Sequence, residues 1–124
     1  MTLKLEKEVE DIRGKIFFFS QNKKWINLVE IKKGFSRGGH YHQFDSLHFI
    51  IAGKVEYLEE DLDANNEKRI VIDSPTMVIT PLKKAHLLTA IEDSTFFEIF
   101  DEPYNAITYP KYRNIVEARM RDKQ

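Results

Sequence analysis

Short runs of β-branched and aromatic residues recur through the first 100 residues of the chain, and turn-forming residues separate them. Glycine, proline, asparagine and aspartate, which favour turns, lie between the runs. The runs have the length of strands and span residues 15–19, 25–32, 47–52, 54–58, 69–72, 77–80, 86–91 and 95–100. Strands of this length at this spacing, with no helical period before residue 110, predict an all-β sandwich or barrel. The small jelly-roll barrel fits the pattern best.

Three further segments complete the expected architecture. The first dozen residues are charged with scattered aliphatic side chains, which predicts an edge strand or an arm. A turn is expected at 63–67, because asparagine tolerates the left-handed backbone conformation. Near the end, Tyr112, Ile115, Val116 and Met120 recur at helical spacing and predict an amphipathic helix over 112–123, docked on the barrel or on a second subunit. The length fits one domain over residues 1–124.

Charge and composition exclude several classes of function. The 19 basic and 20 acidic residues give a formal net charge of −1, which argues against a nucleic-acid partner. The sequence contains no cysteine, so disulfides, thiolate zinc sites and a cysteine nucleophile are excluded. The N-terminal segment lacks the apolar run of a signal peptide, and no window has the length of a membrane span. We therefore expect a cytoplasmic protein with no membrane partner.

Histidines are concentrated around one glycine-rich segment, 33–39, which is expected to be a loop because glycine adopts backbone conformations that other residues resist. His40 and His42 follow Gly38 and Gly39, and in an extended strand two side chains that are two residues apart lie on the same face. His86 lies in a second turn-then-strand segment that a compact β fold can bring beside this pair. Neutral imidazoles are good ligands for a divalent ion such as zinc, iron, manganese or nickel. His40, His42 and His86 are thus candidate metal ligands. His48 is a candidate fourth ligand or a donor that orients the others.

The same segments resemble the cupin superfamily, which carries a glycine-rich HxH motif followed by Glu and Gly, and later P-x-G-x-x-H. Matches lie at His40, His42 and Gly53 for the first motif, and at Pro81 and His86 for the second. At two positions the chain departs from the pattern: Ser46 stands where the family usually has a metal-binding Glu, and Lys83 replaces the Gly of the second motif. The resemblance implies a cupin-type jelly-roll barrel with a small-molecule site inside it.

A second resemblance implies different chemistry. The stretches Asp11-Ile12-Arg13-Gly14 and Arg37-Gly38-Gly39-His40-Tyr41-His42 look like those of the metal-independent nucleotide-sugar 3,4-ketoisomerases and 3,5-epimerases, which carry D-x-R-G and R-G-x-H-x-H. In such an enzyme His40 and His42 would act as acid and base, and Arg37 would hold a diphosphate through its planar fork of donors.

Three functional hypotheses follow from these residues. The first is a small-molecule site with a divalent metal held by His40, His42 and His86. The second is the metal-free isomerase or epimerase, and the third is a module that binds a ligand without catalysis. Tyr57 and Glu98 lie on strands that a jelly roll places near the pocket, so they are candidate ligand contacts alongside Arg37. A homodimer is expected, because small barrels with exposed apolar edge strands often pair with a second copy.

Overall fold

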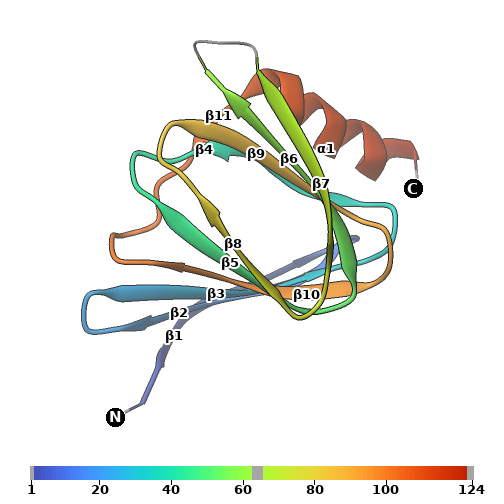
Figure 1. Cartoon of the computed structure of the whole chain (residues 1–124). Coiled ribbons are helices and arrows are strands. Elements are labelled where there is room, and N and C mark those ends of the chain that lie inside the picture. The colour runs from blue at the N-terminus through green and yellow to red at the C-terminus, as the bar shows by residue number, and fades with distance from the viewer. Residues whose placement is uncertain (1, 63–65, 123–124) are drawn as a thin grey trace.

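Two antiparallel sheets face each other in the computed structural model, which describes residues 2–62 and 66–122 (Figure 1). The elements are β1 (Lys4–Asp11), β2 (Gly14–Gln21), β3 (Lys24–Ile31), β4 (Ser36–Tyr41), β5 (Ser46–Ala52), β6 (Lys54–Asp61), β7 (Glu67–Asp73), β8 (Thr76–Thr80), β9 (Lys84–Ala90), β10 (Ser94–Phe100), β11 (Ile107–Thr108) and α1 (Pro110–Asp122). One sheet has the order β1-β2-β3-β10-β5-β8 and the other β11-β4-β9-β6-β7. This arrangement of strands with one C-terminal helix confirms the predicted fold class.

The core lies between the two sheets, where alternating residues of each strand turn inward. Buried aliphatic and aromatic side chains from both sheets pack there, because burying such side chains contributes roughly 1.5–3 kcal/mol each. The buried members of this cluster are Val29, Ile31, Phe35, Ile50, Val55, Tyr57, Ile72, Leu88, Ala90 and Phe96. The predicted strand runs supply most of these residues, which explains why the sequence pattern located them.

One local expectation was wrong, one strand was not foreseen, and one expected turn lies outside the described residues. The glycines were expected in a loop, but β4 begins at Ser36 and includes Gly38 and Gly39. The short strand β11 was not expected, although it pairs with β4. The predicted turn at 63–67 falls largely on residues 63–65, which the structure does not describe. The antiparallel pairing of β6 with β7 agrees with a hairpin at this point of the chain.

Lys83 takes over the backbone role of the glycine that it replaces in the cupin-like second motif. Its φ is 59°, in the left-handed region that favours glycine. The Lys83 amide donates a hydrogen bond to the carbonyl oxygen of His42 at 2.8 Å. The turn before β9 is therefore joined by a backbone hydrogen bond to the end of the segment that carries His40 and His42.

Helix α1 covers the outer face of the β4/β9 sheet, as Figure 1 shows. Pro110 opens the helix, since its fixed φ and missing N–H suit the first helical position. Tyr112 and Val116 are buried against Ala85 and Leu87 of β9. The expected amphipathic helix is thus confirmed, and it docks on its own barrel.

Gly38 and Gly39 allow two close backbone approaches. A Cβ on Gly38 would lie 2.8 Å from the carbonyl oxygen of His86, and a Cβ on Gly39 would lie 2.8 Å from Cα of Arg113. Both glycines have positive φ, and the β4/β9 register shifts between Gly38 and His40. The two glycines therefore let β4 lie against β9 on one side and let α1 lie against β4 on the other.

Large apolar side chains are exposed on several outer strands. They are Leu5 and Val9 of β1, Ile70 and Val71 of β7, and Met77 and Ile79 of β8. Such strands are suited to pairing with a second copy, and the expected homodimer stays a prediction. Within residues 2–62 and 66–122, no helix is long and apolar enough to cross a membrane.

We expect Gly39→Ala to destabilise the fold, because an alanine at a φ of 80° is strained and its Cβ would press on the α1 backbone. The strain alone costs roughly 1–2 kcal/mol. Urea unfolding measures the loss. Gly34→Ala, at a φ of 87° in the turn before β4, reports the backbone strain without a methyl group against the α1 backbone, since Gly34 meets α1 only through its carbonyl oxygen and Arg119. Equal losses in the two variants would contradict the packing role of Gly39.

Candidate functional site

Three imidazoles and one carboxylate converge inside the barrel. His40 and His42 come from β4 and its end, His86 comes from β9, and Glu98 comes from β10 of the opposite sheet. One ligand atom from each of the four lies within 4.8 Å of the others. The ring centre of His40 is 4.8 Å from that of His42 and 4.7 Å from that of His86. The structure thus brings together the three histidines that the sequence singled out as metal ligands.

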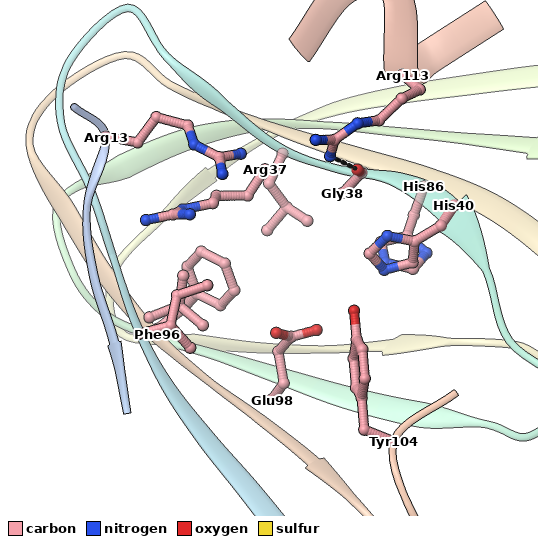
Figure 2. Close-up of a pocket in the computed structure, with 12 residues that line it drawn as sticks. Arg13, Arg37, Gly38, His40, His86, Phe96, Glu98, Tyr104 and Arg113 are labelled. Carbon is pink, nitrogen blue, oxygen red and sulfur yellow. Dashed lines mark hydrogen bonds between the residues drawn. The ribbon is translucent and has the colours of Figure 1, made fainter. Parts of the chain in front are cut away.

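Strand register explains how the four side chains meet. His40 pairs directly with His86 between β4 and β9, and Glu98 pairs directly with His48 between β10 and β5. In Figure 2, His40 and His86 lie side by side at one wall of the cavity, and Glu98 points toward them from the other sheet. The cluster therefore depends on both sheets holding their register.

Each of the three histidines has one ring nitrogen without a hydrogen-bond partner among the described residues. His40 Nε2, His42 Nε2 and His86 Nδ1 are buried and have no hydrogen-bond partner in the part of the chain that the structure describes. His42 Nδ1 lies 2.5 Å from the carbonyl oxygen of Asn105 and must donate to it, so the lone pair of this ring sits on Nε2. Orphaned buried polar atoms are costly, and a bound cation would satisfy them.

The geometry fits a metal ion of ordinary size. Ligand atoms that each lie about 2.1 Å from one ion are at most about 4.2 Å apart. The largest separation in this cluster is 4.8 Å, so the ligand sphere needs to contract by only a few tenths of an ångström at each ligand. Three nitrogens and one carboxylate oxygen suit zinc, iron, manganese or nickel.

The electrostatics favour the protonation states that a metal needs. Burial lowers the pKa of His40 to about 4, and burial also lowers the pKa values of His42 and His86. For Glu98, burial acts to raise the pKa, but contact with His48 and the charges of nearby histidines outweigh it, so the pKa is lowered. At neutral pH the cluster therefore presents neutral imidazoles and an ionised carboxylate.

Glu98 supplies the carboxylate of the cluster, whereas Ser46 stands at the position where the cupin-like motif has Glu. Ser46, at the place of the usual Glu, is buried, and its hydroxyl has no partner among the described residues. The sequence reasoning assigned Glu98 to ligand contact and did not include it among the metal ligands. A signal was present, because this acidic residue interrupts the apolar run Phe96-Phe97-Glu98-Ile99-Phe100. The acidic side chain at the cluster therefore comes from β10, the neighbour of β5 in the sheet.

His48 lies behind Glu98 rather than among the four converging ligand atoms. Its Nε2 is 3.4 Å from Glu98 Oε2, and its Nδ1 is 3.1 Å from the Thr80 hydroxyl oxygen. Tyr57 donates its hydroxyl hydrogen to Glu59 at 2.8 Å, so Thr80 donates to Tyr57 and His48 Nδ1 must donate to Thr80. His48 therefore lies beside the carboxylate of Glu98, and its predicted roles as a fourth ligand or as a donor that orients the other histidines stay predictions.

Tyr57 lies outside the cavity that adjoins the cluster. Its side chain is buried, and its hydroxyl is engaged with Glu59 and Thr80. Arg37, by contrast, lines the cavity and is only 5% exposed. Of the three predicted ligand contacts, Arg37 and Glu98 therefore reach the cavity, and Tyr57 reaches the cluster only through Thr80 and His48.

The cavity has a volume of about 190 Å³ and lies between the sheets (Figure 2). Its lining consists of Arg13, Ile16, Val29, Arg37, Gly38, His40, His86, Leu88, Phe96, Glu98, Tyr104 and Arg113. Sequence reasoning did not propose Tyr104 or Arg113 as site residues, because each comes from a segment after the last long strand. Burial raises the pKa of Tyr104, which keeps its phenol protonated at neutral pH.

The buried histidines predict how stability depends on pH. A histidine in the unfolded chain has a pKa near 6.5, whereas His40 in the fold has a pKa of about 4. Between these values the unfolded state binds more protons, so metal-free protein loses stability as the pH falls from 6.5 toward 4. We expect the melting temperature of chelator-treated protein to fall as the pH is lowered from 6.5 toward 4. In His40→Asn the melting temperature should depend less steeply on pH over this range. An unchanged slope in the variant would contradict the assignment.

Comparisons with known proteins find similarity in structure alone. No family model matches the chain, and no curated protein matches it. Among solved structures, oxalate decarboxylase from Bacillus subtilis superposes with a TM-score of 0.76 at 18% identity, over 86% of this chain and 31% of that one. Oxalate decarboxylase from Lactobacillus farciminis, solved as a formate complex, gives 0.75 at 20% identity, over 86% and 34%.

A third structure belongs to a different kind of protein. CapF from Staphylococcus aureus, a capsular polysaccharide assembling protein, gives a TM-score of 0.68 at 16% identity, over 84% of this chain and 32% of that one. The chain therefore spans about a third of the length of these structures. Their shared architecture shows that this chain has a jelly-roll fold of the cupin type.

Proposed function

We propose that the chain binds a divalent metal ion through His40, His42, His86 and Glu98, and that this centre acts on a small molecule in the adjoining cavity. The observation that carries the proposal is the convergence of three buried imidazoles and one carboxylate, one ligand atom of each within 4.8 Å of the others, together with ring nitrogens that have no hydrogen-bond partner among the described residues. Burying such nitrogens without a hydrogen bond or a cation lowers the stability of the fold. Imidazole nitrogens together with a carboxylate oxygen are ligands that bind divalent transition metals.

Surrounding side chains have distinct tasks in this proposal. A bound ion would act as a Lewis acid toward an oxygen of the small molecule. Asn105 fixes the His42 ring through Nδ1, and His48 Nε2 lies 3.4 Å from one oxygen of Glu98. Such partners of metal ligands set orientation and typically influence affinity by about 10–100-fold. The protonated Tyr104 hydroxyl, which points toward His40 and His86 in Figure 2, can donate a hydrogen bond to the molecule.

The solved neighbours support a metal in this fold. The B. subtilis oxalate decarboxylase was studied for its Mn(II) centres, and the L. farciminis enzyme was solved with formate. At 18% and 20% identity these likenesses concern the fold, so manganese is the first ion to test rather than an assignment.

A metal-free sugar-nucleotide isomerase is the second candidate. In its favour, Arg13, Arg37 and His40 of the two resembling motifs all line the cavity. Two observations weigh against it. A pKa of about 4 makes His40 a weak base, and a cavity of about 190 Å³ is small for a nucleotide-linked sugar. A ligand-binding module without catalysis would use the same site and is distinguished by whether a bound ligand is turned over.

The homodimer and the cytoplasmic location are also part of the proposal. The exposed apolar side chains of β1, β7 and β8 support pairing of two copies. Light scattering measures the oligomeric state directly.

We expect Glu98→Gln to lower metal affinity at least about tenfold, because the neutral amide replaces the charged ligand. Ser46→Ala, at the position where the family pattern places the carboxylate, should keep the metal content of the parent protein. Elemental analysis of untagged protein, after loading with Mn²⁺ and removal of excess ion, measures both. Metal loss in Ser46→Ala with retention in Glu98→Gln would contradict the assigned ligand set.

A further inference from the structure

Three arginines from distant parts of the chain line the same small cavity. Arg13 comes from the turn between β1 and β2, Arg37 comes from β4, and Arg113 comes from the first turns of α1. Figure 2 shows the guanidinium groups of Arg13 and Arg37 on one side of the cavity and that of Arg113 apart from them, beside Gly38. The metal-site candidates His40, His86 and Glu98 belong to the other part of the same lining.

The available carboxylates neutralise only part of this charge. Arg13 binds Asp11 through Nε and Nη2, the latter at 2.7 Å, and its Nη1 donates to the Ser36 carbonyl oxygen. Arg37 lies 3.8 Å from the same carboxylate and otherwise donates to main-chain carbonyl oxygens of Gly14 and Glu30. One aspartate thus serves two guanidinium groups, of which Arg37 is almost fully buried.

Arg113 adds a third positive charge with weak pairing. Its Nη1 is 3.4 Å from the Gly38 carbonyl oxygen, and its Nε is 3.6 Å from the carboxylate of Glu117 on the helix surface. Exposed pairs of this type are worth little. The close approach of α1 at Gly39 is what brings the Arg113 side chain over the cavity. The three guanidinium groups face the carboxylate of Asp11 and the ionised Glu98 of the same cavity, so with the weak Glu117 pair set aside a small excess of positive charge remains beside a desolvated space.

The rest of the lining limits the size and shape of a ligand. Ile16, Val29, Leu88 and Phe96 form an apolar wall of the cavity. The volume of about 190 Å³ is below the roughly 300–1,000 Å³ of pockets for drug-sized ligands. A short molecule with an apolar body fits this space. Guanidinium groups recognise the planar oxygens of a carboxylate, or those of a phosphate, through paired donors.

We propose that the cavity selects a small organic oxoanion, with its anionic group held by Arg113, the buried Arg37 adding positive charge, and its other end directed toward the histidine and glutamate cluster. This inference deepens the proposed function, since it names the class of molecule that the proposed metal centre meets. Carboxylates and phosphate esters share the required chemistry.

Calorimetric titration tests the inference on two forms of the protein, one loaded with Mn²⁺ and one stripped with chelator. The probes are succinate, glycolate, 2-phosphoglycolate and inorganic phosphate, with succinamide as an uncharged match for succinate. We expect saturable binding of at least one anion, none of succinamide, and weaker binding as salt increases. Arg113→Gln should reduce the anion affinity about tenfold or more. Arg121→Gln, the same change on an exposed part of α1, should leave the affinity unchanged.

Titrating both the Mn²⁺-loaded and the chelator-stripped protein distinguishes failure of the oxoanion site from failure of the metal centre. Anion binding that depends on Arg113 in protein unable to retain Mn²⁺ would uphold the oxoanion site and contradict the metal centre. Mn²⁺ retention without saturable binding of any anion would overturn the oxoanion site alone. Equal binding of succinate and succinamide, or an unchanged affinity in Arg113→Gln with its Mn²⁺ retained, would also overturn it. Preference between carboxylate and phosphate probes identifies the source of the anionic group.

Discussion

The pairing of β4 with β9 is the constraint on which the site depends. It sets His40 beside His86, and it is possible at this distance because Gly38 presents no side chain to the His86 carbonyl. The register shift that follows Gly38 turns the chain so that Gly39 meets the backbone of α1. Bulges of this kind re-aim side chains next to functional sites. One short glycine pair thereby fixes the histidine cluster and the position of Arg113 together.

Several polar side chains of the site are buried between the sheets. The imidazoles of His40, His42 and His86 are removed from water, and each has a ring nitrogen without a partner among the described residues. Opposite them, Glu98 remains ionised through its contact with His48. The fold therefore maintains a negative charge and several free lone pairs in a space bounded by aromatic rings. A divalent cation would compensate these costs, and the neighbouring excess of guanidinium charge would then favour an anionic ligand.

The sequence predicted those parts of the site that depend on local pattern. The strand runs, the shared face of His40 and His42 and the recurrence of His86 after a turn all follow from spacing within a few residues. The carboxylate was harder to assign, because Glu98 joins the cluster only through the register of β10 against β5. Arg113 depends on the packing of a helix against Gly39, far away in the sequence. Tyr57 was assigned to the ligand site from strand position, but its hydroxyl bonds to Glu59 and Thr80.

The most direct test of this account is a crystal structure of Mn²⁺-loaded protein with anomalous diffraction data collected near the manganese edge. We predict an anomalous peak that is ligated by His40, His42, His86 and Glu98, with distances from ion to ligand atoms of about 2.0–2.3 Å. Density for His48 should remain behind Glu98 without direct contact to the ion. A cluster without a peak, or a peak held instead by surface carboxylates, would contradict the central claim.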